Sequence, residues 1–371
     1  MTLARTWSVA LAGLDGSLVE VEADLAPGLP ALTVVGLPDA ALSEARDRVR
    51  AAVVNTGEAW PLRRITVNLS PATLRKVGSV FDVAIAAALL CAAGVVPGGR
   101  LEGTVLLGEL GLDGRVRPVR GVLPAVLLAC RQGHPRVVVP AACVEEARLV
   151  PGAEVIGVGS LRGLLCWLRG ESVIDELAPA RPPLPEAAPI ALPDLVEVAG
   201  QIEARRALEV AAAGGHHLFF LGEPGCGKTM LAERLPGLLP DLDLLTALEV
   251  TAVHSLAGIL PPDSPLVRRP PWRAPHHTAT RSALIGGGSG VPRPGAASCA
   301  HRGVPCVYLD AVSRGGCATG PRAGDPDRIA RLLRQVAGST CHPHLAAAPT
   351  VVRRAETLSD ALLDRLDVSS P

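Results

Sequence analysis

Brief apolar runs alternate with alanine-rich segments through the first 170 residues of the chain. The runs are rich in Val, Ile and Leu, as buried strands are, and they lie at residues 31–36, 64–69, 104–110 and 136–140. The alanine-rich segments repeat apolar residues at helical spacing, and they lie at residues 43–55, 81–93 and 123–131. Ser43 is of a type that caps helix starts, and Gly94 of a type that ends helices. The alternation predicts an α/β domain.

The pattern changes at residues 171–193, which are rich in Pro, Ala and acidic residues and lack helical periodicity. Such a segment is typical of an interdomain linker. We therefore expect a first domain over residues 1–170, a linker over 171–193 and a second domain over 194–371. In the second domain, residues 201–213 have an amphipathic helical pattern, and an apolar run at 217–222 leads directly into a glycine-rich loop.

Composition narrows the class of protein. The chain has 371 residues, of which 48% are hydrophobic and 19% charged, so a disordered chain is excluded. Its formal net charge is zero, and any contact with a polyanion must therefore be local. The nine cysteines include no Cys-x-x-Cys pair and the first residues have no signal-peptide pattern, which favours a reduced, cytoplasmic protein. The apolar run at 83–96 is shorter than the roughly 18 residues of a membrane span, so no membrane partner is expected.

A phosphate-binding motif of the form GxxxxGK[ST] follows the apolar run of the second domain. Its residues are Gly222, Glu223, Pro224, Gly225, Cys226, Gly227, Lys228 and Thr229. The glycines allow backbone N–H groups to point at phosphate oxygens, the lysine reaches the β- and γ-phosphates, and the threonine hydroxyl binds Mg²⁺. Because the whole motif lies between a strand pattern and a helix pattern, it predicts a site for ATP and Mg²⁺.

A phosphate-binding loop of this kind is usually accompanied by another strand that ends in an aspartate for Mg²⁺ and a carboxylate for catalysis, and here that motif is incomplete. Residues 307–310 (VYLD) place Asp310 at a strand end, where it would contribute to Mg²⁺ binding. The next residue is Ala311, so no carboxylate follows to orient an attacking water. An aspartate that only begins a turn is the alternative interpretation.

A basic stretch without Asp or Glu covers residues 268–302. Its arginines are Arg268, Arg269, Arg273, Arg281, Arg293 and Arg302. Two interpretations have equal support: contact with a nucleic-acid phosphate backbone, or a solvated loop whose arginines pair with acids from elsewhere in the fold. His276 and His277 have no third ligand at a suitable spacing, so a metal site is not predicted there.

The loop and three later stretches together resemble the YifB/ComM family of magnesium-chelatase-like AAA+ ATPases. The later stretches are residues 247–257 (ALEVTAVHSLA), 273–278 (RAPHHT) and 286–302. Four earlier stretches resemble the Lon-protease-like N-terminal domain of that family: 35–50, 64–71, 76–84 and 108–123. The resemblance implies an α/β Lon-like domain followed by a P-loop AAA+ αβα domain, in hexameric ATPases associated with DNA branch migration and transformation.

The Lon-like domain raises the question of proteolysis, because Lon proteases use a serine nucleophile and a lysine base. By resemblance, Leu123 occupies the position of that lysine, and Ser79 lies away from the position of the nucleophile. Lys76 is the only lysine of the domain, and it precedes a different turn. A serine without an activating base is a poor nucleophile, so we expect no protease activity.

After residue 302 the sequence departs from the family pattern. The family has Asp-Glu where this chain has Asp310 and Ala311, and Ala348 takes the place of the sensor asparagine. Residues 358–367 resemble the segment that carries a trans-acting arginine, which implies Arg365 as the candidate catalytic residue. The sequence stops at Pro371, before the helical lid of the family. These differences predict impaired hydrolysis in a domain that lacks its lid.

Three functions stay open at this point. The first is a family member that binds ATP and Mg²⁺ but hydrolyses ATP poorly. The second is an active, ATP-driven DNA branch-migration translocase in which Glu249 or Asp325 replaces the missing carboxylate. The third is a non-enzymatic protein that modulates a full-length homologue. The resemblance implies a homo-hexamer or a mixed ring with homologues, with DNA as a candidate partner.

Overall fold

The computed structural model describes residues 3–37, 39, 42, 44–74, 76–171, 192–216, 218, 220, 225–261, 265–276, 279–287 and 293–305. The chain forms two compact units. The first comprises residues 1–186 and 254–266, and the second comprises residues 187–253 and 267–371. Most of the expected linker over 171–193 lies outside the described residues.

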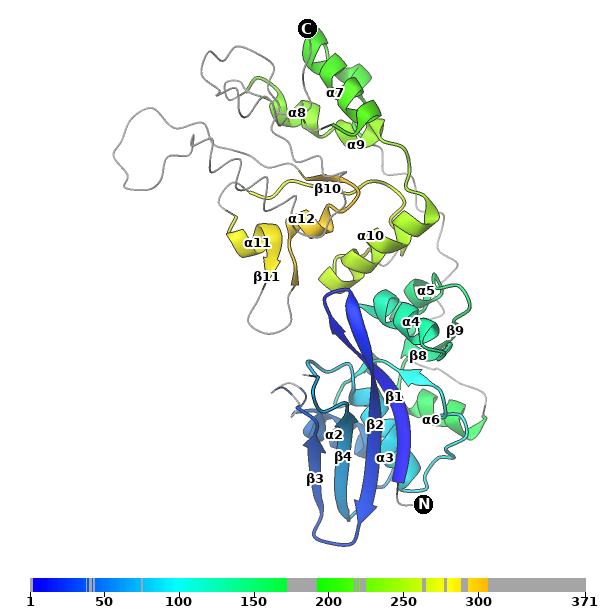
Figure 1. The fold of residues 1–371 in the computed structure, drawn as a ribbon. Helices are drawn as coiled ribbons and strands as arrows, with labels where there is room; N and C mark the ends of the chain where they lie inside the picture. Colours follow the sequence, from blue (N-terminus) through cyan, green and yellow to red (C-terminus); the bar gives the residue numbers. More distant parts are fainter. Residues whose placement is uncertain are drawn as a thin grey trace, which may run out of the picture. The chain divides into compact units, whose positions relative to one another are not determined.

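The first unit alternates strands and helices (Figure 1). Its strands are β1 (Leu3–Ala12), β2 (Asp15–Ala26), β3 (Ala31–Val35), β4 (Arg64–Ser70), β5 (Val105–Leu106), β6 (Glu109–Leu110), β7 (Val116–Arg117), β8 (Arg136–Pro140) and β9 (Glu154–Val158). Its helices are α2 (Ala45–Asn55), α3 (Asp82–Ala92), α4 (Val122–Arg131), α5 (Val144–Ala147) and α6 (Leu161–Arg169), with a short 3₁₀ turn at Ala141–Cys143.

Seven of these strands form one mixed sheet in the order β3-β4-β2-β1-β5-β8-β9. The pairs β1–β2 and β2–β4 are antiparallel, whereas β3–β4, β1–β5, β5–β8 and β8–β9 are parallel. Helices α2 and α3 cover one face of the sheet formed by β1 to β4 (Figure 1). The main core therefore lies between the sheet and these helices.

Strand β2 shows how the sequence selects the faces of this sheet. Val19, Val21 and Ala23 alternate with acidic residues, and all three valine and alanine side chains are fully buried. The acidic side chains lie on the other face, where Glu22 pairs with Arg5 of β1 at 3.0 Å. An antiparallel pair with one solvated face gives this alternation of apolar and charged residues.

Helix α3 is apolar on all sides and almost entirely buried, yet it begins with an aspartate. The Asp82 carboxylate accepts two hydrogen bonds from Arg48 of α2, at 2.7 and 3.0 Å, and a third from the Leu110 backbone N–H at 3.2 Å. Burial raises the pKa of Asp82, although the bonds from Arg48 and Leu110 act in the opposite direction. The pair joins α2, α3 and β6 inside the core.

The second unit is built of shorter elements. They are a 3₁₀ turn at Leu195–Glu197, the helices α7 (Ile202–Gly214), α8 (Lys228–Ala232), α9 (Leu235–Leu238), α10 (Leu244–Ala257), α11 (Arg281–Ile285) and α12 (Ala296–Cys299), and the strands β10 (Trp272–Arg273), β11 (Gly286–Gly287), β12 (Arg293–Pro294) and β13 (Val304–Pro305). Helix α10 begins in this unit, and its last residues belong to the first unit. A small core gathers the buried side chains Leu195, Val198, Leu208, Leu231, Leu235 and Val304.

Most of the elements expected in the first unit are confirmed, with two differences. The single strand expected over 104–110 is wrong: β5 and β6 lie in different sheets, because Gly108 between them has a φ of +156°. A Cβ at Gly108 would lie 2.8 Å from Val83 and 2.9 Å from Val116, so no other residue fits this close approach. The long hairpin β1–β2 was not predicted. Ser43 and most of the run at 217–222 lie outside the described residues.

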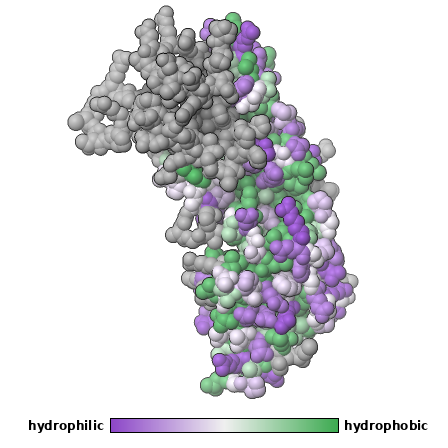
Figure 2. All heavy atoms as spheres, viewed as in Figure 1, coloured by the Kyte–Doolittle hydropathy of each residue, from purple (hydrophilic) through white to green (hydrophobic). Residues whose placement is uncertain are grey.

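Among the described residues, no helix is both long enough and apolar enough to cross a membrane. Figure 2 shows hydrophilic and hydrophobic side chains intermixed on the viewed face.

Replacing Asp82 by Ala should lower the free energy of unfolding by about 3 kcal/mol, because it leaves the Arg48 guanidinium without its buried partner. The matched control is Asp47→Ala, which removes the exposed ion pair with Arg46 at 3.2 Å and should cost less than about 0.5 kcal/mol. Urea denaturation measures both. Equal losses in the two variants would contradict a structural role for the buried pair.

Candidate functional site: the loop before helix α8

The second half of the phosphate-binding motif lies within the described residues. Gly225 and Gly227 have φ values of +86° and +85°, a region that favours glycine. Gly227 is the N-cap of α8, and Lys228 and Thr229 are the first residues of that helix. Lys228 Nζ donates to Cys226 Sγ at 3.5 Å. The two glycines thus give the loop a backbone turn directly before the lysine and threonine of the motif.

The side chain of Gln201 fastens this loop from the start of helix α7. Its Nε2 donates to the carbonyl oxygen of Cys226 at 3.2 Å. The backbone of Gln201 has a φ of +48°, and its carbonyl accepts the Arg205 N–H at 2.9 Å as α7 begins. A Cβ at Gly227 would lie 3.0 Å from the same Nε2, so a glycine there permits the close approach.

Arg234 fastens the other end of α8 to the same segment of chain. Its guanidinium donates to the carbonyl oxygens of Asp194 and Met230, each at 2.8 Å, and to Glu197 Oε2 at 2.9 Å. Only 11% of its side chain is exposed. Residues 194–201 therefore lie along the loop and α8, held at one end by Arg234 and at the other by Gln201.

The basic stretch divides into paired and exposed arginines. Arg269 Nε lies 3.9 Å from Asp241, and Arg302 lies 4.0 Å from Glu249. Arg268 and Arg293 are exposed. Arg273 lies in β10 with its Nε buried and without a hydrogen-bond partner among the described residues. Acids from elsewhere in the unit thus meet some of these arginines, as one of the two interpretations expected.

Glu249 does not have the setting expected of a replacement for the missing carboxylate. It lies in α10, and its Oε2 is 3.5 Å from His301 Nε2 in addition to the contact with Arg302. It is thus engaged with the basic stretch.

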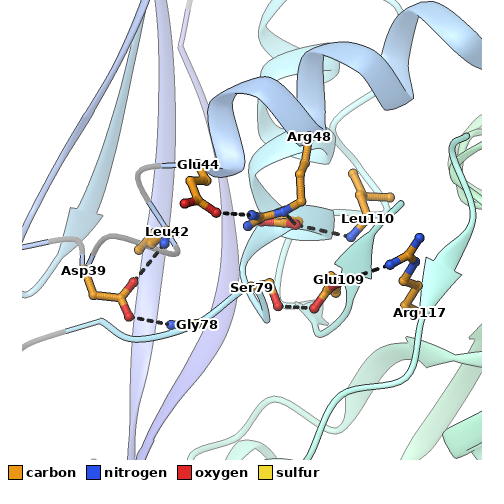
Figure 3. A network of polar contacts seen from close by, with 10 residues as sticks. Asp39, Leu42, Glu44, Arg48, Gly78, Ser79, Glu109, Leu110 and Arg117 are labelled. Carbon is orange, nitrogen blue, oxygen red and sulfur yellow. Dashed lines mark hydrogen bonds and ion pairs between the residues drawn. The ribbon is translucent and has the colours of Figure 1, made fainter. Parts of the chain in front are cut away.

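The candidate protease residues of the first unit have separate partners. Ser79 donates to Glu109, which lies 3.9 Å from Arg117 (Figure 3). Lys76 is fully buried and donates to the carbonyl oxygens of Leu69 and Pro71, and burial lowers its pKa. The ammonium group thus binds backbone carbonyls.

Leu123, which by resemblance occupies the position of the Lon lysine, has a structural contact of its own. The backbone N–H of Leu123, at the start of α4, donates to Glu146 Oε1 at 2.8 Å. Burial raises the pKa of the Glu146 carboxyl. A carboxylate therefore caps the helix at this position.

Several predicted site residues lie outside the described part of the chain: Gly222, Glu223, Pro224, Asp310 and Arg365. The same is true of His277, Asp325 and Ala348, which the sequence analysis also discussed. Arg281 begins α11, and only its backbone is described. Among the described residues, no three His, Cys, Asp or Glu side chains gather in a group that could hold a metal ion.

Comparison with known proteins matches both units. Residues 194–314 match the family described as magnesium chelatase, subunit ChlI, and residues 21–143 match the family described as subunit ChlI of Mg-chelatase. The uncharacterized protein YifB of Escherichia coli is 40% identical over 311 residues, which cover 84% of this chain and 60% of YifB. The competence protein ComM of Haemophilus influenzae is 39% identical over 315 residues, with the same coverage. This chain belongs to the YifB/ComM family of magnesium-chelatase-like proteins.

Two further relatives, one matching almost the whole chain and one matching part of it, agree with that assignment. An uncharacterized protein of Mycobacterium tuberculosis is 52% identical over 391 residues, which cover 99% of this chain and 76% of that protein. A Lon protease of Sorangium cellulosum is 30% identical over 149 residues, or 38% of this chain and 18% of the protease. The fold class expected from the sequence, a Lon-like α/β domain followed by a magnesium-chelatase-like domain, is therefore confirmed.

Two residues that fasten the loop of this YifB/ComM protein were not predicted. Gln201 was assigned only to the pattern of an amphipathic helix, and Arg234 to no motif. Their contacts join residues 25 and 40 positions apart, at Cys226 and Asp194 respectively. Gly200, directly before Gln201, is the one local signal, because glycine is common at the boundary of a helix.

The thiols of this YifB/ComM protein should differ in reactivity at pH 8. Burial, with a smaller effect of Glu146, raises the pKa of Cys143 to about 11. About one Cys143 in a thousand is then a thiolate at that pH, whereas Cys226 in the loop is exposed. We expect iodoacetamide to modify Cys226 at least about 100-fold faster, as measured by peptide mass spectrometry over time. Equal rates would contradict the burial of Cys143 or the exposure of the loop.

Proposed function

We propose that this protein binds ATP together with Mg²⁺ through residues 222–229 and acts in DNA processing. The observation that carries the proposal is the positive φ of both Gly225 and Gly227 directly before Lys228. Glycines in this region turn successive backbone N–H groups toward an anion, and a lysine adds a positive charge. A Cβ at Gly225 would have no neighbour within 4 Å among the described residues, so space is left beside the loop.

The residues present fit the chemistry of Mg·ATP. Lys228 would bind the β- and γ-phosphates, and the exposed hydroxyl of Thr229 would bind the metal ion, with Asp310 as a further ligand. Bound Mg²⁺ neutralises phosphate charge. The protein would thus supply the backbone donors, one cation and two oxygen ligands.

The same proposal includes impaired hydrolysis. Ala311 stands where a carboxylate would orient water, and Ala348 stands at the sensor position. The loss of one positioned polar group lowers a rate by roughly 10²–10³. Arg365 would reach the nucleotide of a neighbouring subunit in a homo-hexamer or in a mixed ring with homologues. The name of the relative ComM, a competence protein, supports a role in DNA uptake or recombination.

The DNA-contacting surface of this proposal consists of the exposed arginines of the basic stretch. Arg268 and Arg293 are exposed, and among the described residues neither forms an ion pair that it would have to break to approach a phosphate. Arg269 and Arg302 would first have to leave Asp241 and Glu249. The expected footprint is therefore smaller than the six arginines of the sequence suggest.

The substitution Lys228→Ala should weaken ATP binding by about 100-fold, because it removes the one side-chain cation of the loop motif. The control is Arg206→Ala, an exposed arginine of helix α7. Fluorescent-nucleotide titration measures affinity, and single-turnover assays with and without branched DNA measure hydrolysis. Turnover that depends on Lys228 and rises with DNA would contradict impaired hydrolysis and favour the active translocase.

The variants Arg268→Ala and Arg293→Ala should each weaken binding to duplex DNA and lower the slope of log affinity against log salt by about 1. Arg269→Ala is the matched control, since this arginine already lies 3.9 Å from Asp241, and it should change the slope less. Fluorescence anisotropy over a range of salt concentrations measures the slopes. Unchanged slopes for Arg268 and Arg293 would exclude this surface.

A further inference from the structure

The hydrogen bond from Gln201 acts on one peptide unit of the candidate nucleotide loop. Its Nε2 holds the Cys226 carbonyl oxygen at 3.2 Å. A peptide bond is planar and trans, so the C=O of Cys226 and the N–H of Gly227 point in opposite directions. Fixing the carbonyl on the Gln201 side therefore turns the Gly227 N–H away from Gln201.

The segment that carries Gln201 is itself held in place. Leu195 and Val198 are 5% and 1% exposed, and they pack with Leu231 of α8 and Leu235 of α9. Arg234 binds the Asp194 carbonyl and the Glu197 carboxylate at the far end of the segment. Because the segment is anchored by both apolar and polar contacts to α8 and α9, the Gln201 amide is presented to the loop from a fixed support.

We propose that Gln201 is a positioning residue for nucleotide binding. It keeps the Gly227 N–H available to the β-phosphate of a nucleoside di- or triphosphate. The inference rests on the proposed function of the loop, and it adds a residue outside the GxxxxGK[ST] motif to that site. Glycine is favoured at position 227 because its φ is +85°, and a Cβ there would also lie 3.0 Å from the Gln201 amide, close enough to disturb that hydrogen bond.

Two variants test the role. Gln201→Glu keeps the size of the side chain but replaces the donor by an oxygen that faces the Cys226 carbonyl, and Gln201→Ala removes the group without adding charge. Affinities for ATP and ADP should fall about tenfold in both variants. Affinity for AMP, which has no β-phosphate, should stay within about twofold. Glu209→Gln, an exposed position on the same helix, is the matched control and should change none of the three affinities.

The pattern across the three nucleotides separates positioning from simple structural support. Equal losses for AMP, ADP and ATP, or no loss for any of them, would overturn the proposal. The proposal would also be overturned if the nucleotide-free variants melted at so low a temperature that partial unfolding explained the lost affinity. Gln201 is exposed, so both variants should fold. If the wild type and Lys228→Ala bind ATP equally poorly, the proposed function of the loop fails. If Lys228→Ala loses ATP binding but both Gln201 variants keep it, the proposed function stands and only the inference about Gln201 fails.

Discussion

The guanidinium of Arg234 holds together the two pieces of chain on which the candidate nucleotide site depends. One piece is residues 194–201, which follow the expected linker, and the other is α8 with the loop before it. Without this contact the segment would be held only by the packing of Leu195 and Val198 and by the Gln201 hydrogen bond itself, so Gln201 would lose part of its support. A planar cation with five donors suits the task, since it binds two carbonyl oxygens and a carboxylate at once.

The first unit rests on a different interaction, the buried pair of Arg48 and Asp82. It joins two helices and a short strand inside the core of that unit. Ser79, Lys76 and Leu123 are each committed to other contacts. These polar residues hold loops and a helix start in place.

Local patterns predicted much of the first unit and only part of the site. The β-branched runs of β3, β4 and β8 and the alanine-rich helix α3 are recognisable because each element carries its own pattern of apolar residues, which is visible without knowing its neighbours. The hairpin β1–β2 was missed because its alternating acids dilute the apolar signal of β2. Gly108 splits a continuous apolar run, since its conformation depends on Val83 and Val116 from elsewhere. The contacts of Gln201 and Arg234 are set by the fold, and no spacing in the sequence reveals them.

The most direct test of the account is hydrogen–deuterium exchange of the full chain with and without Mg·ATP. The account predicts slower exchange of backbone amides in residues 225–232 and in residues 194–201 when nucleotide is present, because both pieces hold the same loop. Amides of β1 to β4 should exchange at unchanged rates. Unchanged exchange at residues 225–232 under saturating Mg·ATP would contradict the nucleotide site itself.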